Sequence, residues 1–302
     1  MTATGTSNNL YLWTIGTSKR YKLTNTKIYG VKIYRNNILE ADIIPVIDLD
    51  DTICMYDKVS NRLLYNAGTG NFIAGTDIEN PYVTDGLVSM WDAEFNCFSG
   101  LHSTNATKWN DIVSGYNLEL ASGTPTWEAK ANVIKGKWGI VSPELQALFK
   151  AANKNNLSYE LCFSALPYNP IKGTALGFNN TLIGTIVNNA TIGDWCWSGN
   201  WIPSNKFKTT RKGTLSVVRN GQTGRTDVYA DGETFGGKTG SSSNPTGRTF
   251  GIGYGYGSWN SPPTGIKIHC IRVYNRMLTE SEIQKNKDID ASRFGLGTKS
   301  DL

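Results

Sequence analysis

The chain has 302 residues, enough for two ordinary domains or for one large β-domain with an appendage, and we favour the second organisation. Glycine is abundant, at 32 residues, and only 18% of residues are charged, which indicates many short strands with tight turns and excludes a disordered or mainly helical chain. Lys and Arg total 30 against 25 Asp and Glu, but the positive residues are scattered, so we expect no nucleic-acid partner.

The cysteines and the N-terminus indicate a chain that folds in a cytoplasm. The cysteines are far apart in the sequence and form no close pair of the kind that metal sites and redox motifs use. We therefore expect reduced, mostly buried thiols at Cys54, Cys97, Cys162, Cys196 and Cys270. The first residues lack a basic stretch followed by an apolar one, and no segment has the eighteen apolar residues of a membrane span, so no membrane contact is predicted.

The first region is predicted to be a small all-β unit. Its expected strands are Leu10–Ile15, Lys27–Arg35, Ile43–Ile47, Thr52–Asp57 and Arg62–Asn66. Ser60-Asn61 should form the last turn between them, and the glycines of residues 66–70 should reverse the chain before a strand at Phe72–Ala74. The turn signals Asn80-Pro81 and Asp85-Gly86 then predict a boundary between domains at 1–83 and 84–302.

A short internal repeat links the two regions. The sequence IYGVKIYR at Ile28–Arg35 is echoed by IHCIRVYN at Ile268–Asn275. Both copies are basic, β-branched and aromatic, so both are predicted to be strands. A repeat of one unit at this distance indicates two similar modules in series, the first of them incomplete.

The second region is predicted to contain many strands and two helices. A strand at Leu87–Asp92 precedes the turn-rich residues 109–120, and a helix is expected over Ser142–Lys154 because Ser142 can cap it and Pro143 suits its first turn. Apolar and polar residues then alternate from Leu157 to Ser164, which predicts a strand with one face in the core.

Further strands and one helix complete the region. The strands are expected at Thr181–Val187, Asp194–Trp197, Thr214–Arg219, Thr226–Ala230, Arg248–Tyr254 and Ile266–Tyr274. Asn220-Gly221 and Asp231-Gly232 are predicted hairpin turns, and the capping box Thr279–Glu282 should begin a short terminal helix. Roughly ten strands with two short helices describe a two-sheet sandwich.

Several stretches resemble a known family. The opening DGLVSMWD, the strand YELCF, VVRNGQTGRTDVYADG (217–232) and IHCIRVYNRMLTESEI (268–283) resemble concanavalin A-like or laminin G-like jelly rolls over about residues 84–295. KIYGVKIYRNNILEADIIPV (27–46) and MYDKVSNRLLYNAGTGNF (55–72) resemble the closing half of laminin G-like modules in phage tail and minor structural proteins.

The resemblance implies an all-β, concanavalin A-like jelly-roll sandwich with a smaller N-terminal β unit that resembles the closing half of a second such module. It also implies a phage virion protein of the tail or fibre, assembled in the bacterial cytoplasm, with other tail proteins as partners and several copies, as a homo-oligomer, in one particle. We expect it to recognise a bacterial surface glycan without enzymatic activity. A purely structural tail component and a glycoside hydrolase or lyase of the same fold are the alternatives.

The residues argue against catalysis. Relatives of this fold that cleave polysaccharides carry two or three acids alternating on one strand, and hydrolysis needs such a pair. That pattern is absent here, and the nearest approach is Asp92-Ala93-Glu94. Glu160 is alone on its strand, Glu280 and Glu282 are explained by helix capping, and His102 and His269 lie in no recognisable triad, so no catalytic residue is predicted.

Two aromatic stretches are the candidate ligand-binding residues, because sugar rings stack on aromatic rings while polar groups select hydroxyls. The first stretch contains Trp195, Trp197, Asn200 and Trp201. The second, within Gly251–Asn260, contains Tyr254, Tyr256, Trp259 and Asn260, with glycines that leave the backbone open to a ligand. In the alternative, these rings fill the sandwich interior.

No cofactor and no metal site is predicted. Some laminin G-like modules bind calcium through aspartates at one rim, so the resemblance makes calcium possible here. The available acids are Asp50, Asp51, Asp92 and Asp231. They form no dense run of oxygen ligands, and Asp231 is explained by its hairpin turn.

Overall fold

The computed structural model describes residues 28, 30–48, 52–66, 82–97, 102–165, 172–188, 191–195, 201–208, 212–240 and 244–295. Of residues 47, 165, 188, 191–195, 201–208 and 235 it describes the backbone alone. The chain divides into two compact units, residues 1–78 and 79–302. The dividing point therefore lies somewhat before the predicted boundary at 83/84.

The first unit contains a sheet of four antiparallel strands in chain order. They are β1 (Val31–Arg35), β2 (Ile38–Ile47), β3 (Ile53–Asp57) and β4 (Arg62–Leu64). Asn36 and Asn37 both have positive φ, 50° and 62°, as a two-residue type I′ hairpin turn requires. Asn61, with φ 54°, lies in the turn predicted at Ser60-Asn61. The predicted Leu10–Ile15 and Phe72–Ala74 strands lie outside the described residues.

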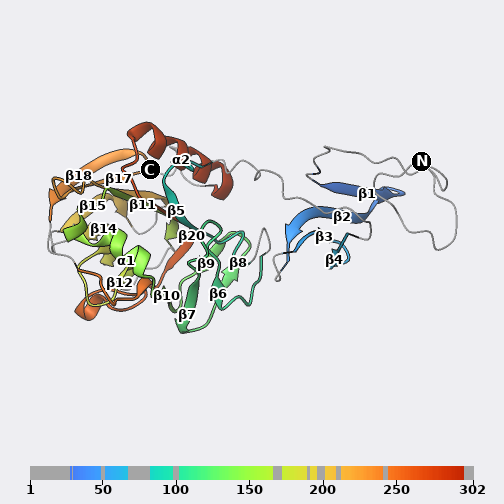
Figure 1. Cartoon of the computed structure of the whole chain (residues 1–302), viewed down its shortest axis with the longest axis horizontal. Helices are drawn as coiled ribbons and strands as arrows, with labels where there is room; N and C mark the ends of the chain where they lie inside the picture. The colour runs from blue at the N-terminus through green and yellow to red at the C-terminus, as the bar shows by residue number, and fades with distance from the viewer. Residues whose placement is uncertain are drawn as a thin grey trace. The chain divides into compact units, whose positions relative to one another are not determined.

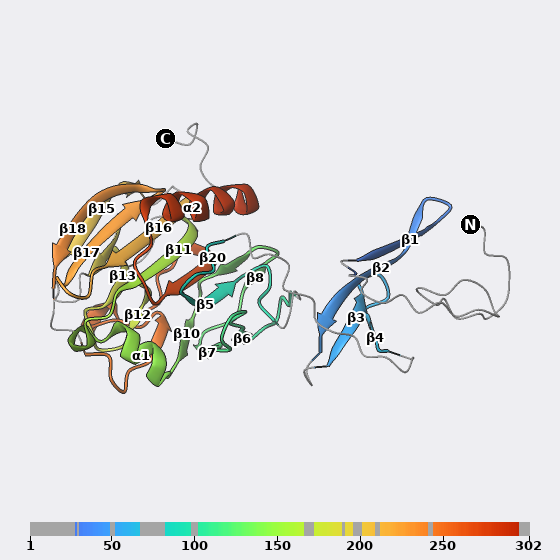
Figure 2. The same ribbon diagram turned by 45° about the horizontal axis from the view of Figure 1, so that its top comes forward.

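The second unit is a sandwich of two antiparallel sheets with eight strands each (Figure 1, Figure 2). The front sheet has the order β15 (Trp201–Lys208), β14 (Thr191–Trp195), β13 (Gly184–Asn188), β12 (Gly173–Phe178), β19 (Phe250–Ile252), β10 (Lys137–Ile140), β7 (Leu118–Ser122) and β6 (Lys108–Trp109). The back sheet has the order β18 (Glu233–Thr239), β17 (Arg225–Ala230), β16 (Lys212–Arg219), β11 (Leu157–Ala165), β20 (Ile266–Tyr274), β9 (Ala131–Val133) and β8 (Trp127–Glu128), and β5 (Leu87–Asp92) also pairs with β20.

The all-β jelly-roll prediction is confirmed, but the sequence underestimated the number of strands. The turn-rich residues 109–120 contain the end of β6 and the start of β7, and β8 has only two residues. Strands this short carry no detectable alternation of apolar and polar residues, because the period of two needs about four residues to show. Pairing with neighbours, rather than local pattern, makes these segments strands.

The helices begin where their capping residues predict. In α1 (Pro143–Phe149), the Ser142 side chain accepts a hydrogen bond from the Leu145 N–H, and the 3₁₀ turn η1 (Ala151–Asn153) follows. The terminal helix α2 (Glu280–Phe294) begins with a complete capping box between Thr279 and Glu282. With 15 residues α2 is longer than the short helix expected, and Gly295 ends it at φ 64°.

The main core lies between the two sheets. Leu157, Tyr159, Leu161 and Phe163 of β11 point into it, as their alternation predicts. At one end, the tryptophan cluster formed by Trp109, Trp127 and Trp138 joins the sheets, with ring centroids 5.1 to 6.4 Å apart and steep interplanar angles. Edge-to-face rings of this kind add to the stabilisation by buried area.

The other face of β11 is also buried, which corrects the prediction of a strand with one face in the core. Glu160 and Cys162 on that face are fully buried, because α2 packs over the back sheet (Figure 1, Figure 2). The opposite residue on β20 is Arg272, which is also fully buried. A polar face under a helix needs partners for its charges, since an unpaired buried charge is costly.

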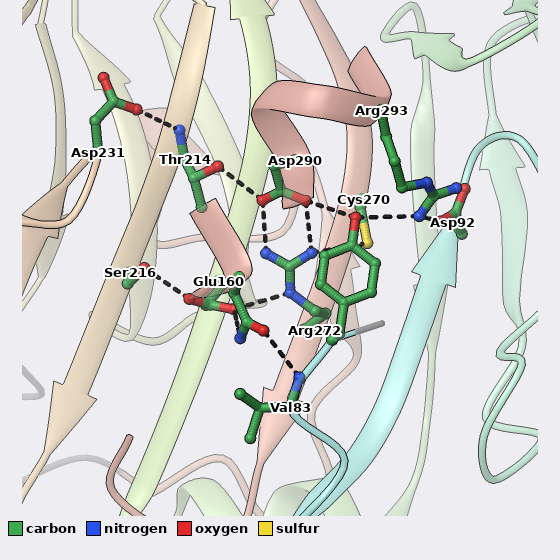
Figure 3. A network of polar contacts seen from close by, with 12 residues as sticks. Val83, Asp92, Glu160, Thr214, Ser216, Asp231, Cys270, Arg272, Asp290 and Arg293 are labelled. Atoms are coloured by element: carbon green, nitrogen blue, oxygen red, sulfur yellow. Dashed lines mark hydrogen bonds and ion pairs between the residues drawn. The ribbon is translucent and has the colours of Figure 1, made fainter. Parts of the chain in front are cut away.

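A buried charge network provides those partners (Figure 3). Arg272 donates two hydrogen bonds to the carboxylate of Asp290 on α2, at 2.8 and 2.6 Å, and a third from Nε to Glu160 at 2.8 Å. Ser216 and Asn286 also donate to Glu160, both at under 3 Å. Burial raises the pKa of Glu160, and the charge of Arg272 opposes that shift. The charged groups of Glu160, Arg272 and Asp290 at the centre of the network therefore all have hydrogen-bond partners.

The same network includes the start of the second unit. The Tyr82 hydroxyl donates to Asp290 at 2.7 Å, and the Val83 N–H donates to Asn286 at 2.9 Å. The Arg272 guanidinium also lies 4.2 Å from the centre of the Tyr82 ring. These contacts explain why residues 82 and 83 belong to the second unit rather than to the first.

The described cysteines carry free thiols. Cys54, Cys162 and Cys270 are buried and Cys97 is half-buried, while Cys196 lies outside the described residues. Burial raises the pKa of the Cys162 and Cys270 thiols well above the usual value, which keeps them protonated and unreactive.

Candidate functional site

The segment after β19 folds back over the front sheet and forms what we call the rim loop (residues 253–265), which contains the 3₁₀ turn η2 (Gly257–Trp259). Thr174 on β12 holds this loop at its first residue and at two positions near its middle. Its carbonyl oxygen accepts from the Gly253 N–H at 2.8 Å, its N–H donates to the Ser261 carbonyl at 2.9 Å, and its hydroxyl donates to the Trp259 carbonyl at 2.8 Å. The loop therefore presents its side chains from a fixed backbone.

A row of glycines lies beneath the rim loop. In the ladder of the front sheet, Gly139 pairs with Gly251, Gly251 with Gly177, and Gly177 with Gly184. A Cβ atom on Gly139 would lie 2.5 Å from Cε2 of Tyr254, and one on Gly177 would lie 2.8 Å from the Tyr254 carbonyl oxygen. The missing side chains let the loop rest directly on the strands.

The rim loop exposes its four predicted residues to different extents. Tyr256 is 56% exposed, whereas Tyr254, Trp259 and Asn260 are half-buried. The ammonium of Lys172 lies 3.8 Å from the centre of the Trp259 ring, so one face of that indole is already in contact with a cation. Tyr256 is thus the most open of the described rings in the loop.

A second lysine joins the other two residues. Lys137 on β10 donates to Oδ1 of Asn260 at 3.2 Å, and its ammonium lies 5.3 Å from the centre of the Tyr254 ring. Burial raises the pKa of the Tyr254 phenol, so this hydroxyl stays protonated at neutral pH and can donate a hydrogen bond. Tyr254, Asn260 and Lys137 therefore form one polar cluster beside the exposed Tyr256.

The front sheet is hollowed next to this cluster. A hollow of about 300 Å³ lies over β6, β7 and β10, and its lining is Lys108, Gly115, Asn117, Glu119, Gly139, Ile140 and Val141. Gly139 lines the hollow, and the Tyr254 ring packs against the same glycine. The hollow and the polar cluster are therefore neighbours. The sequence missed this hollow because β6, β7 and β10 were not predicted as strands.

The first aromatic stretch is described only in part. The backbone of Trp195 pairs with Gly184 on one side and with Trp201 on the other, so both tryptophans continue the row of paired positions that contains the glycines. The strands β12 and β13 separate β14 from β19, a distance of roughly 14 Å at ordinary strand spacing. Trp197 and Asn200 lie outside the described residues.

The carboxylates considered for catalysis are tied into the fold. Arg293 of α2 donates to Oδ2 of Asp92 at 2.6 Å and to Oε2 of Glu94 at 2.9 Å (Figure 3 shows the contact with Asp92). Asp92 is fully buried, and burial raises its pKa although Arg293 opposes the shift. Glu160 and Asp290 also converge, but they do so around Arg272 in the interior rather than across an open cleft.

His269 has a structural environment. Its Nδ1 lies 2.6 Å from the Lys130 carbonyl oxygen and its Nε2 lies 2.7 Å from the Ser164 hydroxyl. A carbonyl can only accept, so Nδ1 carries a proton. Burial, the largest cause, lowers the pKa of His269 and so favours the neutral ring, in which Nε2 accepts from the Ser164 hydroxyl.

This arrangement predicts a loss of stability in mild acid. Because the folded-state pKa of His269 is below its unfolded value of 6.5, the unfolded chain takes up the proton first as the pH falls. The stabilisation by the buried, neutral His269 is complete above pH 6.5 and declines as the pH falls below it. In urea unfolding at pH 7.5 and 5.5, the His269→Gln protein should lose less stability between the two pH values than the unmodified protein. An equal loss in both would contradict the assignment.

No metal site or membrane span is found within the described ranges. Those residues contain no group of three or more His, Cys, Asp or Glu side chains placed to hold a metal ion. Asp50 and Asp51 lie outside the described part, Asp92 is paired with Arg293, and Asp231 accepts from the Thr214 N–H in its hairpin. Likewise, neither described helix combines the length and the apolar character needed to span a bilayer.

Comparisons with known proteins support the fold. A family model described as the concanavalin A-like lectin/glucanases superfamily matches residues 183–284, which begin just before β13 and end within α2. No curated protein matches this chain. The family match covers the central and later strands of the sandwich, and with the two antiparallel sheets it identifies the architecture as concanavalin A-like.

Solved structures with a similar course of the chain come from larger proteins. The Trypanosoma rangeli sialidase in complex with sialic acid is 13% identical, with a TM-score of 0.47, and the match covers 89% of this chain and 45% of that one. A structure of botulinum neurotoxin type C, whose cell entry is described as dependent on interaction with two ganglioside molecules, is 12% identical with a TM-score of 0.46, and the match covers 68% of this chain and 51% of that one. The receptor-binding domain of the botulinum C/D mosaic serotype is 14% identical with a TM-score of 0.45, covering 70% and 52%. At these values the likeness carries no conclusion about function.

Proposed function

We propose that this protein is a non-enzymatic carbohydrate-recognition module. The observation that carries the proposal is the rim loop, which presents Tyr256 in the open and Tyr254, Trp259 and Asn260 beside it from a backbone anchored to β12. An exposed ring offers a stacking surface for a sugar, and the neighbouring amide, phenol and ammonium groups can select hydroxyl positions. The family description of a lectin and glucanase superfamily is consistent with this role.

The non-enzymatic part of the proposal is supported by the state of the acids. Hydrolysis of a glycosidic bond uses two carboxyl groups on opposite sides of the bond. The hollow beside the rim loop has one acid in its described lining, Glu119, which is paired with Lys108 at 3.3 Å. Asp92 and Glu94 are held by Arg293. None of these carboxyl groups is placed to act with another as general acid and nucleophile or base.

We place this activity in a phage tail or fibre that attaches to a bacterial surface glycan. The support is the resemblance of residues 27–46 and 55–72 to modules of phage tail and minor structural proteins. A shallow surface with one open ring binds weakly, so attachment would depend on several copies in one particle, with other tail proteins as neighbours. Mass spectrometry of virions from a host that carries the gene would test this setting, and its absence from the particle would contradict it.

The binding proposal predicts a specific loss. Replacing Tyr256 by alanine removes the exposed stacking surface without touching the anchors of the rim loop, so retention on immobilised bacterial glycans should fall about tenfold. The measurement is a glycan array followed by isothermal titration with the best ligand. Tyr34→Ala removes an equally exposed tyrosine, 60% accessible, from the first unit and serves as the matched control.

Two outcomes would redirect the proposal. Equal retention of both variants would remove Tyr256 from the site. If the unmodified protein binds no glycan or wall preparation at all, the structural alternative gains support.

One observation already favours a packing role for the first unit, because Tyr34 and Ile38 of its sheet are more than half exposed.

A further inference from the structure

Two lysine ammonium groups that contact the rim loop have no acidic partner among the described side chains. Lys137 lies on β10 and Lys172 directly precedes β12, yet they contact the consecutive residues Asn260 and Trp259. Among the residues for which side chains are described, neither ammonium has a carboxylate within 4 Å. By contrast, Lys108 in the adjoining hollow is paired with Glu119 at 3.3 Å.

These two cations are held in place rather than simply solvated. The stem of Lys137 packs on the rim loop, since a Cβ atom on Gly253 would lie 2.9 Å from its Cγ, and its ammonium bonds to Asn260. The ammonium of Lys172 lies 3.8 Å from the centre of the Trp259 ring, and its backbone is fixed by the Ser261 hydroxyl, which donates to the Lys172 carbonyl oxygen at 3.3 Å. Side chains positioned in this way lose little further entropy when a ligand binds them.

Their partners are all neutral. An aromatic face and an amide oxygen orient an ammonium group but leave its full charge available, whereas a carboxylate would neutralise it. Two uncompensated positive charges beside an exposed sugar-stacking ring create a local potential that favours a negatively charged ligand. Lys137 and Lys172 differ from Lys108 of the same sheet in that their ammonium groups contact neutral groups, whereas Lys108 is paired with Glu119.

We propose that Lys137 and Lys172 form an anion subsite of the rim loop, so that the ligand is an acidic polysaccharide rather than a neutral one. This inference rests on the proposed function, and it adds the charge class of the glycan. The anionic group can be a sugar carboxylate or a phosphodiester of a wall polymer, since both present oxygens to an ammonium. The sugar ring itself would stack on Tyr256.

The test compares polymers that differ in charge. Polygalacturonate carries a carboxylate on each residue, its fully methyl-esterified form has the same backbone without the charge, and polyglycerol phosphate supplies phosphodiesters. We expect the unmodified protein to bind the charged polymers at least tenfold more tightly than the ester at low salt. Binding to the charged polymers should weaken as sodium chloride rises from 50 to 500 mM, because exposed charges are screened. A preference between the two charged polymers identifies the source of the anion.

Variants separate the subsite from general attraction. Lys137→Gln and Lys172→Gln should each weaken binding of the preferred polyanion about fivefold, while Lys108→Gln, which removes the same charge from a paired lysine, should change it less than twofold. Thermal unfolding of each variant checks that the fold is kept. Equal losses in all three variants would mean nonspecific attraction and would overturn the inference.

The inference and the proposed function fail in different ways. Equal binding of polygalacturonate and its ester, with loss in Tyr256→Ala, would overturn the anion subsite and leave carbohydrate recognition in place. Failure to bind either charged polymer would also overturn the subsite, and the glycan array would then decide whether neutral sugars bind. Binding that depends on both lysines and on Tyr256 supports both.

Discussion

Replacing Asp290 by asparagine should lower the free energy of unfolding by about 3–5 kcal/mol, the usual cost of removing one partner from a buried ion pair. Asp290 accepts from Arg272, Tyr82 and Thr214, and no atom of its carboxylate or of the guanidinium is exposed. Asparagine keeps the shape but presents an N–H₂ group to donors. Glu160 would then be the one carboxylate left to compensate the positive charge of Arg272, in a site that water does not reach.

The measurement is equilibrium unfolding in urea, with Asp288→Asn as the matched control. Asp288 lies on the exposed side of the same helix and pairs with Lys287 at 3.1 Å in contact with water, so its replacement should cost less than about 1 kcal/mol. Similar losses in the two variants would show that the buried network contributes no more than a surface pair. The Asp290→Asn protein also tests whether α2 is held chiefly by this network. If the helix is released from the sheet, proteolysis should begin early within residues 280–294.

Replacing Trp109 by alanine should cost about 3–5 kcal/mol as well, through a cavity rather than through charge. Trp109 is fully buried, its ring lies 5.1 Å from that of Trp127 and 6.4 Å from that of Trp138, and its N–H donates to the Asp92 carbonyl at 3.1 Å. Removing it leaves a void between the sheets and one unpaired carbonyl. Neither neighbouring indole can fill that void without giving up its own contacts.

The Tyr256→Ala variant is the control for this second change. It also truncates a large aromatic residue, but Tyr256 is 56% exposed, so its loss should alter stability by less than about 0.5 kcal/mol. Urea or thermal unfolding of both proteins gives the comparison. A loss in Trp109→Ala no larger than the loss in the control would mean that the tryptophan cluster does not join the two sheets.

Local patterns in the sequence predicted much of the fold. The strands at Leu87–Asp92 and Ile266–Tyr274 have the predicted bounds, and the capping residues Ser142 and Thr279 begin the helices where expected. The Asp231-Gly232 hairpin has positive φ at both residues, 51° and 84°, as its turn type requires. These features depend on a few neighbouring residues, so the sequence contains all the information that specifies them.

The partners of the charged and glycine residues depended on tertiary structure. The sequence placed Glu160 on a strand but could not show that Arg272 and Asp290 meet it, because those partners are 112 or more positions away along the chain and come together only when α2 covers the back sheet. In the same way, the alignment of Gly139, Gly251 and Gly177 beneath the rim loop follows from strand order.

For the candidate site, the sequence determined which residues were available, namely Tyr254, Tyr256, Trp259 and Asn260 in a glycine-rich stretch. Only the folded sandwich decided which ring is open and which cations lie beside the rings. Lys137 on β10 and Lys172, just before β12, reach Asn260 and Trp259 although they are far away in the sequence. The physical reason is that periodicity and turn chemistry act over a few residues, whereas exposure and charge pairing depend on which strands become neighbours.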